Sequence, residues 1–555
     1  MGSGHVLAYA FDVFMQLYTA EGFRERDAAE LIMTNNLFGL EIDKRAYQLA
    51  YFAIMMKGRE YNRRILSKEI KLNLHQFIDS PEIPNEYFER LAEVSPYSYE
   101  LTTTLLNQLT RLLDQFKNAS EIGSILKIEE LQQSELDQLD QFIGSFEFFS
   151  DMDILYQLPE IQTKVISILN ITRVLMTKYT AVTTNPPYLN KMSSNLDKYV
   201  KKNYPDVKTD LFSIFIKMNS NILTNGGYAG FMTPFVWMFI KSYEELRSFL
   251  ITNKSISSLI QMEYSAFEEA TVPVCCFMIK NAKTEPVGNY LKLSDFKGGM
   301  TVQKEKVLEA IQDNSAEYFY QTNQNKLINI PGSPLSFWVS ENIYQNFIEK
   351  KISTYGEVKS GIMVNSRYIL EWFEVNISDI QLNGQIISDM DDYRWFPLNS
   401  GGGFRKWYGN NGPIIDLENN GQRVKKAKNN YRLRNSDYYF KKGITWGRIT
   451  SSNISFRWSR QGNLFGDAGP MIFIDNDDDL KLILGLSNTK VMLSLTNVLN
   501  PTINFQVDDF NNIPVIQNNN YKEKINEIVT TCVEISKLDE SFCESSWDFN
   551  RNPLV

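Results

Sequence analysis

The 555-residue sequence contains two histidines, four cysteines and no run of eighteen apolar residues. Two histidines, His5 and His75, are too few for a histidine-rich metal site, and no Cys/His spacing is typical of zinc ligands. We therefore expect no metal. The sequence predicts buried thiols in a reducing, prokaryotic cytoplasm. They are Cys275, Cys276, Cys532 and Cys543.

Without a long apolar run, no transmembrane helix and no membrane partner are expected. The N-terminus also lacks the basic stretch and apolar core of a secretory signal. The length predicts about two to four domains. The apolar and charged fractions, 43% and 22%, are those of an ordinary globular protein.

The net charge of −9 argues against a nucleic-acid partner, but the charge is unevenly distributed. Between residues 401 and 460 there are thirteen basic and three acidic residues, so this stretch carries +10 and the remainder about −19. A basic stretch in an acidic protein is typical of a surface that binds phosphates, although charge runs are more often solvated faces. Aromatic residues interleave with these bases, which favours nucleic acid. The predicted phosphate contacts are Arg405, Lys406, Lys425, Lys426 and Arg432.

The rest of the chain is organised around residues 181–188, an apolar strand-like approach that runs into Asn185-Pro186-Pro187-Tyr188. Two consecutive prolines end the strand, so the chain turns stiffly at the edge where ligands bind in open α/β sheets. The Asn185 side-chain oxygen and the Pro186 carbonyl can hold the two N–H bonds of a planar amine. That arrangement directs the lone pair of the amine toward an electrophile. Tyr188 can stack on the ring, whereas the alternative is a rigid surface turn.

The N-terminal segment Gly2-Ser3-Gly4 leads directly into a helical pattern, which lets a ligand approach the backbone at a helix N-terminus. A tag remnant would also fit these residues. Further on, residues 36–43 predict a short strand that ends in acids. Glu41 or Asp43 can accept hydrogen bonds from ribose hydroxyls, and the other can cap the following helix.

Several weaker patterns complete the sequence. Residues 70–74 predict a third strand, and 84–178 predict an all-α insertion. Asp210 can cap a helix over 210–216, with a catalytic role as the alternative. Residues 226–234 predict a turn followed by a strand, and 257–260 and 271–279 two closing strands of one sheet.

In this order the pieces resemble the amino-methyltransferases that use S-adenosylmethionine, specifically the DNA adenine-N6 class. The resemblance implies that Gly2, Ser3 and Gly4 hold the cofactor and that Glu41 or Asp43 holds its ribose. It also implies that Asn185-Pro186-Pro187-Tyr188 is catalytic and that Phe267, before Val272, clamps the flipped base against Tyr188. Asp210-Leu211-Phe212 and Gly226-Gly227 match further family motifs.

The C-terminal half resembles the PglX family, the large adenine methyltransferases of BREX phage-defence systems. The matching segments are 337–340, 401–408, 443–446, 499–507 and 544–554. The family's segment upstream of Gly2 is missing, so the chain is expected to be the middle of a longer protein. The resemblance implies that double-stranded DNA is the partner, with other defence-system proteins as additional partners.

The sequence therefore predicts an α/β protein with a Rossmann-like methyltransferase sheet and a mixed α/β target-recognition domain. The predicted domains are a catalytic domain over 1–285, a DNA-binding domain over 286–515 and a helical junction over 516–555. The predicted function is site-specific DNA adenine-N6 methylation in phage defence or restriction–modification. The alternatives are a DNA-binding fragment without turnover and an amino-methyltransferase acting on RNA or on protein glutamine.

Overall fold

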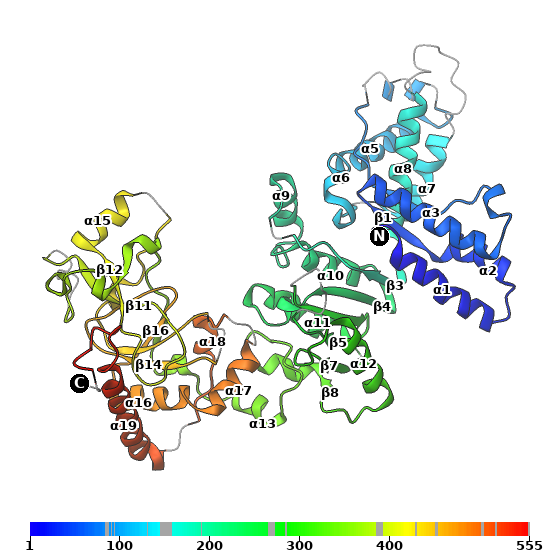
Figure 1. Ribbon diagram of the computed structural model, residues 1–555. Coiled ribbons are helices and arrows are strands. Elements are labelled where there is room, and N and C mark those ends of the chain that lie inside the picture. Colours follow the sequence, from blue (N-terminus) through cyan, green and yellow to red (C-terminus); the bar gives the residue numbers. More distant parts are fainter. Residues whose placement is uncertain are drawn as a thin grey trace. The chain divides into compact units, whose positions relative to one another are not determined.

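A computed structural model gives the fold of this chain. It describes every residue except 84–87, 90–91, 94, 130, 145–157, 190, 265–271, 284–285, 385–391, 428–429, 450–452, 501–503, 517–518 and 553–555. The described residues form two compact units (Figure 1). The first comprises Met1–Phe235 and Thr252–Phe319, and the second Val236–Ile251 and Tyr320–Val555.

The first unit begins with three helices and a pair of short strands. The elements are α1 (His5–Ala20), α2 (Glu25–Leu31), β1 (Phe38–Glu41), α3 (Lys44–Tyr61) and β2 (Asn73–Gln76). β1 and β2 pair in parallel, with Leu40 opposite His75. The predicted third strand therefore lies about three residues later than expected, because only the segment from Asn73 onward reaches the edge of β1.

Helices fill the described part of the predicted insertion: α5 (Tyr99–Gln115), α6 (Ala119–Ile122), α7 (Gln133–Gly144) and α8 (Leu158–Met176). Ser98 begins α5 by accepting a hydrogen bond from the Leu101 amide. The leucines of α5 and α7 are buried against those of α8 in one apolar cluster. Leucines recur at helical spacing, so each helix has one apolar face, and these faces can be buried only against one another.

A six-stranded sheet follows, in the order β3-β4-β6-β5-β7-β8. Its strands are β3 (Tyr179–Thr184), β4 (Leu223–Pro234), β5 (Ser255–Gln261), β6 (Val274–Lys280), β7 (Val287–Lys292) and β8 (Phe319–Asn323). β3 runs parallel to β4, and β6 is antiparallel to both β4 and β5. β7 pairs in parallel with β5, so the sheet continues past residue 285, the predicted end of the catalytic domain.

Two helices connect β3 to β4: α9 (Ser194–Asn203) and α10 (Leu211–Asn221). The predicted turn at Gly226-Gly227 lies inside β4, where the register with β3 shifts. Gly226 has a φ of 75°, and a Cβ at Gly227 would come within 3.0 Å of the Tyr179 and Thr180 carbonyls. Glycine is therefore required at both positions, by backbone conformation at the first and by close approach of β3 at the second.

The predicted α/β class is confirmed, but β1 and β2 form a sheet separate from the six strands. The rings of Phe38 in β1 and Tyr179 in β3 meet edge to face with centroids 5.3 Å apart. Among the strands that the structure describes, none pairs with the outer edge of β1 or of β3. Two sheets therefore stand where the sequence predicted one.

The second unit contains two four-stranded sheets, ordered β10-β12-β11-β15 and β14-β13-β16-β9. Their strands are β9 (Glu357–Lys359), β10 (Ile369–Glu371), β11 (Trp395–Asn399), β12 (Pro413–Asp416), β13 (Gly443–Trp446), β14 (Phe456–Ser459), β15 (Leu464–Phe465) and β16 (Met471–Phe473). The helices are α13 (Glu341–Asn346), α15 (Glu418–Lys426), α16 (Asp477–Ser487), α17 (Lys490–Leu499), α18 (Val507–Asn511) and α19 (Lys522–Glu540). α12 (Gly299–Gln312) belongs to the first unit, and α11 (Glu244–Asn253) lies mostly in the second.

Among the described residues, no single helix is both long enough and apolar enough to span a membrane. Taken together, α16 and α17 meet both criteria, but the pair is bent by 77°. All four cysteines are free thiols. Only Cys275 is fully buried, whereas Cys276, Cys532 and Cys543 are partly exposed, which corrects the prediction that all four are buried.

Candidate active site

The Asn185 corner, residues 185–189, forms where β3 ends. Thr184 is the last residue of the strand, and Pro186 is buried while the Asn185 side chain is exposed. The Pro186 carbonyl accepts no hydrogen bond from any residue that the structure describes. β3 and β4 are parallel, so the corner lies at their carboxyl ends, the predicted edge of the sheet.

Tyr188 folds back over the same corner. Its hydroxyl donates to the Asn185 Oδ1 atom at 3.1 Å and lies 3.4 Å from the Met232 carbonyl at the end of β4. Its ring meets Phe212 edge to face at 6.3 Å. Burial, with the nearby Cys275 and Cys276 thiols, raises the pKa of Tyr188 to about 12, so the hydroxyl is neutral at physiological pH.

Asp210 fixes the far side of the corner. Its Oδ1 atom accepts the Leu189 amide at 2.9 Å and the Phe212 amide at 3.3 Å, so one carboxylate ends the corner and begins α10. The predicted cap is present. Burial raises the pKa of Asp210 above its ordinary value, although the N–H groups of Leu189 and Phe212 oppose this shift.

The second predicted cluster joins the N-terminal glycines to the end of β1. Glu41 accepts the Gly2 amide at 2.7 Å through Oε2, and the Ile42 and Asp43 amides at 3.0 and 3.1 Å through Oε1. Burial alone would raise the pKa of Glu41. The Asp43 amide, the Met1 ammonium and the Gly2 amide together lower this pKa by more, so the net shift is downward. Asp43 caps α3 by accepting the Ala46 amide at 2.8 Å, which leaves Glu41 as the acid that faces the glycines.

The glycines themselves differ in what constrains them. Gly2 and Gly4 both have positive φ, and a Cβ at Gly4 would lie 2.8 Å from the Ala50 Cα atom. A Cβ at Gly2 would meet nothing within 4 Å, so space is open beside the loop. The Ser3 hydroxyl is hydrogen-bonded to the His5 Nδ1 atom at 2.9 Å.

Ile42 is a residue of this cluster that the sequence did not single out. Ile42 directly follows Glu41 and is 51% exposed. Its place between two acids was the sequence signal that could have identified it. Among the described residues, no hydrogen bond or ring contact joins this cluster to the Asn185 corner. The predicted base clamp, Phe267, lies outside the described residues.

The predicted phosphate contacts occupy different environments in the second unit. Arg405 is paired with Asp539 at 2.5 Å and with Glu540 at 3.0 Å, and Lys406 donates to the Asn488 carbonyl at 2.7 Å. The remaining three are exposed, and none of them forms an ion pair with a described residue: Lys425, Lys426 and Arg432.

Three of the seven tyrosines and tryptophans between these bases are buried, and the other four are partly exposed. Tyr408, Tyr439 and Trp446 are buried, and Arg457 is also buried. Trp446 lies in β13, whose four residues are all buried, whereas Tyr408 and Tyr439 are buried from segments outside the strands. These three rings therefore do not support the interpretation that the interleaved aromatic residues favour nucleic acid.

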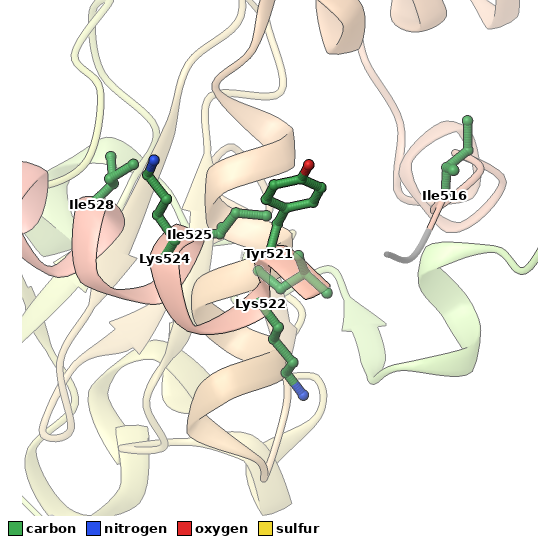
Figure 2. Close-up of a pocket in the computed structure, with 7 residues that line it drawn as sticks. Ile516, Tyr521, Lys522, Lys524, Ile525 and Ile528 are labelled. Carbon is green, nitrogen blue, oxygen red and sulfur yellow. The ribbon is translucent and has the colours of Figure 1, made fainter. Parts of the chain in front are cut away.

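Two further features complete the inventory. In the chain as described, no group of three or more His, Cys, Asp or Glu residues is arranged to hold a metal ion. A cavity of about 400 Å³ lies beside the first turns of α19, with Lys522 and Lys524 pointing to different sides of the helix (Figure 2). It contains none of the predicted site residues, and its lining is Leu482, Ile516, Tyr521, Lys522, Lys524, Ile525 and Ile528.

Residues 35–267 match the Eco57I restriction-modification methylase family. The whole chain is 31% identical to the adenine-specific methyltransferase BrxX of Escherichia coli O9:H4 (strain HS) and 30% identical to the adenine-specific methyltransferase PglX of Lacticaseibacillus casei (strain Zhang). The resemblance to PglX-type methyltransferases is confirmed. The chain covers 46% of each relative, so it spans about half of their length.

Two solved structures share the fold. A nuclease-deletion mutant of the Type ISP restriction-modification enzyme LlaGI, in complex with a DNA substrate mimic, has a TM-score of 0.53 at 11% identity. It covers 96% of this chain, which in turn covers 44% of LlaGI. The Type IIL enzyme MmeI, in complex with DNA, has a TM-score of 0.50 at 10% identity and covers 99% of this chain, which covers 71% of MmeI.

Proposed function

We propose that this chain carries the catalytic site of a site-specific DNA adenine-N6 methyltransferase of a phage-defence or restriction–modification system. The main support is the Asn185 corner, where an exposed carboxamide and a Pro186 carbonyl without a donor lie at the carboxyl end of β3. Two acceptors at one corner match the two N–H bonds of an exocyclic amine. The similarity to adenine-specific methyltransferases supports the same substrate.

S-adenosylmethionine is the proposed cofactor, and the residues near Gly2 fit its nucleoside part. Glu41 is the acid proposed to accept the ribose hydroxyls, which requires it to exchange some of the amide hydrogen bonds that it accepts in the free protein. Ile42 offers exposed apolar surface beside it. The open space beside Gly2 lets a ligand approach the backbone at the start of α1. When bound, the cofactor supplies an electrophilic methyl group on a sulfonium.

In the proposed mechanism, DNA presents an adenine rotated out of the duplex, at a cost of a few kcal/mol. The Asn185 Oδ1 atom and the Pro186 carbonyl accept the N6 hydrogens, and the Tyr188 ring stacks on the base with Phe267 as its proposed counterpart. The bound cofactor would supply its methyl group to N6, and N6 would lose a proton to water. The leaving group is a neutral thioether, so positioning and electrostatics carry the reaction.

Methyl transfer from labelled S-adenosylmethionine to duplex DNA tests this proposal. Asn185→Ala should abolish transfer while leaving cofactor affinity unchanged, because Asn185 lies in the corner and not beside Gly2. The matched control is Asn225→Ala, an exposed asparagine near the opposite end of β4. Equal transfer by Asn185→Ala and Asn225→Ala proteins would refute the catalytic assignment.

The same assay separates the alternatives. A DNA-binding fragment without turnover would bind the duplex and transfer no methyl group. An RNA or protein-glutamine methyltransferase would transfer the label to RNA or protein when all three substrates compete.

A further inference from the structure

The Gly401–Phe404 loop connects β11 to the segment before β12 in the second unit. Three of its four residues are exposed: Gly402, Gly403 and Phe404. Phe404, at the tip of this glycine-rich loop, is 53% exposed, although exposing an apolar ring to water is unfavourable in free energy. The loop therefore presents an apolar side chain of which the described chain covers only about half.

The ends of this loop are tightly held. Arg457, only 2% exposed, donates to the Gly401 carbonyl at 2.5 Å, and the Asn410 side chain donates to the Gly401 and Gly403 carbonyls at 3.2 and 3.0 Å. On the other side, the Arg405 amide donates to the Ser455 hydroxyl at 3.0 Å. Hydrogen bonds to the Gly401 and Gly403 carbonyls and from the Arg405 amide thus hold the loop on both sides of Phe404.

The amides at the tip have no such partners. The backbone N–H groups of Gly402, Gly403 and Phe404 donate no hydrogen bond to any described residue. Successive free backbone N–H groups on an exposed loop are a common site for anionic oxygen, and backbone amides contribute to phosphate contacts on DNA. The loop thus combines three adjacent donors with one apolar ring.

The glycine at 403 is not required by the fold. Gly401 and Gly402 have positive φ, and a Cβ on either would come within 2.7 Å of a neighbouring atom. Gly403 has no positive φ, and a Cβ there would meet nothing within 4 Å. The fold therefore has room for a side chain at position 403. Because glycine has none, a ligand can approach the backbone there closely.

We infer that the Gly401–Phe404 loop docks on the DNA strand, with its free amides on a backbone phosphate and Phe404 packed against the adjoining nucleotide. This inference rests on the proposed function and adds a contact element to it. A phosphodiester next to a sugar and base presents anionic oxygen beside a flat, weakly polar surface, which matches the three donors and the ring. Because the loop carbonyls and the Arg405 amide are already hydrogen-bonded, ordering the loop on binding should cost less.

The neighbouring charges are consistent with a contact that does not depend on ion pairing. Arg405, the nearest base in sequence, is neutralised by Asp539 and Glu540. The loop should therefore contribute affinity through hydrogen bonds and ring packing, with little change in the salt dependence of binding. Loss of a lysine contact would instead reduce the salt slope, because each neutralised phosphate releases counterions.

The test is fluorescence anisotropy of a labelled duplex with the 555-residue chain and three variants at several salt concentrations. Phe404→Ser should weaken binding about fivefold to 150-fold, the range for ring–base packing. Gly403→Ala should weaken it about twofold to tenfold, the range for lost hydrogen bonds. The matched control, Phe373→Ser, removes another ring that is 58% exposed in the same unit and should leave binding unchanged.

Each outcome decides the inference. Weaker binding by Phe404→Ser and Gly403→Ala, with an unchanged salt slope and unchanged thermal melting, supports it. Equal binding by wild type and Phe404→Ser, or equal losses for Phe404→Ser and Phe373→Ser, refutes the loop contact and leaves the methyltransferase proposal intact. No duplex binding by the wild-type chain refutes both the loop contact and DNA as the substrate.

Discussion

The Tyr188 hydroxyl donates a hydrogen bond of 3.1 Å to the Asn185 Oδ1 atom, the acceptor proposed for the adenine amine. The tyrosine therefore occupies in the free protein the position that a substrate N–H would take. A substrate N–H must displace this hydroxyl or use the second lone pair of the oxygen, and the ring of Tyr188 remains available for stacking in both cases.

Replacement of Tyr188 separates these two roles. Tyr188→Phe keeps the ring and frees the acceptor, so methylation should stay within about threefold of wild type, less than the effect of one net hydrogen bond. Tyr188→Ala removes the ring, and loss of ~1–3 kcal/mol of stacking should lower kcat/KM about fivefold to 150-fold. Steady-state methyl transfer to duplex DNA measures both. Equal losses of methyl transfer in the two variants would mean that the Tyr188 hydroxyl, and not the ring, contributes to the reaction.

The pH dependence of the same reaction is a second prediction. The pKa of Tyr188 is raised to about 12, so its hydroxyl stays protonated throughout the range in which the protein is assayed. A free phenol would lose its proton near pH 10. The pH profiles of wild type and Tyr188→Phe should therefore be parallel between about pH 7 and pH 10. A basic limb present only in wild type would contradict this prediction.

Asp210 allows a prediction about stability. Its raised pKa means that the protonated form is favoured in the fold, so its contribution is fully present below the ordinary carboxyl pKa and is lost as pH rises through the raised value. Asp210→Asn keeps the acceptor for the Leu189 and Phe212 amides without a buried charge, so its melting temperature at pH 7 should equal or exceed that of wild type. Asp210→Ala removes the cap and should cost about 1 kcal/mol. Thermal melts at pH 5 and pH 8 measure both effects.

Glu41 should control cofactor binding independently of the corner. Glu41→Ala removes the acceptor for the Gly2 amide and the proposed ribose contact, so affinity for S-adenosylmethionine should fall about tenfold or more, as for the loss of a hydrogen bond to a charged group. Isothermal titration calorimetry measures this affinity. Asp43→Ala is the matched control, because Asp43 caps α3 and should affect stability more than affinity. The reverse pattern would assign the ribose contact to Asp43.

The predicted phosphate contacts should divide into two groups. Lys425→Gln and Lys426→Gln should each reduce the salt slope of DNA binding by about 0.9, with no change in melting temperature. Arg405→Gln should instead destabilise the second unit by about 1–3 kcal/mol, because Glu540 is buried and loses its partner. Chemical denaturation and salt-dependent anisotropy distinguish these effects. If Arg405→Gln reduced the salt slope of DNA binding without lowering stability, Arg405 would have to leave Asp539 and Glu540 and contact a phosphate when DNA binds.

What the sequence could predict was mostly local. Two prolines after β3 force a turn at Asn185, and the aspartates at 43 and 210 begin helices, because each of these effects acts within a few residues. Four strands of the six-stranded sheet, β3 to β6, likewise overlap segments that the sequence predicted as strands, whereas β7 and β8 were not predicted. The site assignments that depend on family resemblance, including the role of Phe267, remain predictions.

What the sequence could not predict depends on contacts between distant residues. The basic character of residues 401–460 is reduced by acids that are distant in sequence, such as Asp539 beside Arg405 and Asp548 beside Arg460. The position of β2 was set by its pairing with β1, not by its own apolar run. The buried aromatics show the same limit, since an inward-facing ring and an outward-facing ring have the same sequence signature.

The double role of Asp210 has a dynamic consequence. Because one carboxylate holds both the Leu189 and the Phe212 amides, the end of the proline turn cannot detach unless the first turn of α10 also loosens. The two amides should therefore exchange their hydrogens with deuterium at a common rate set by one opening event. Breathing of the turn and fraying of the helix would then be the same motion.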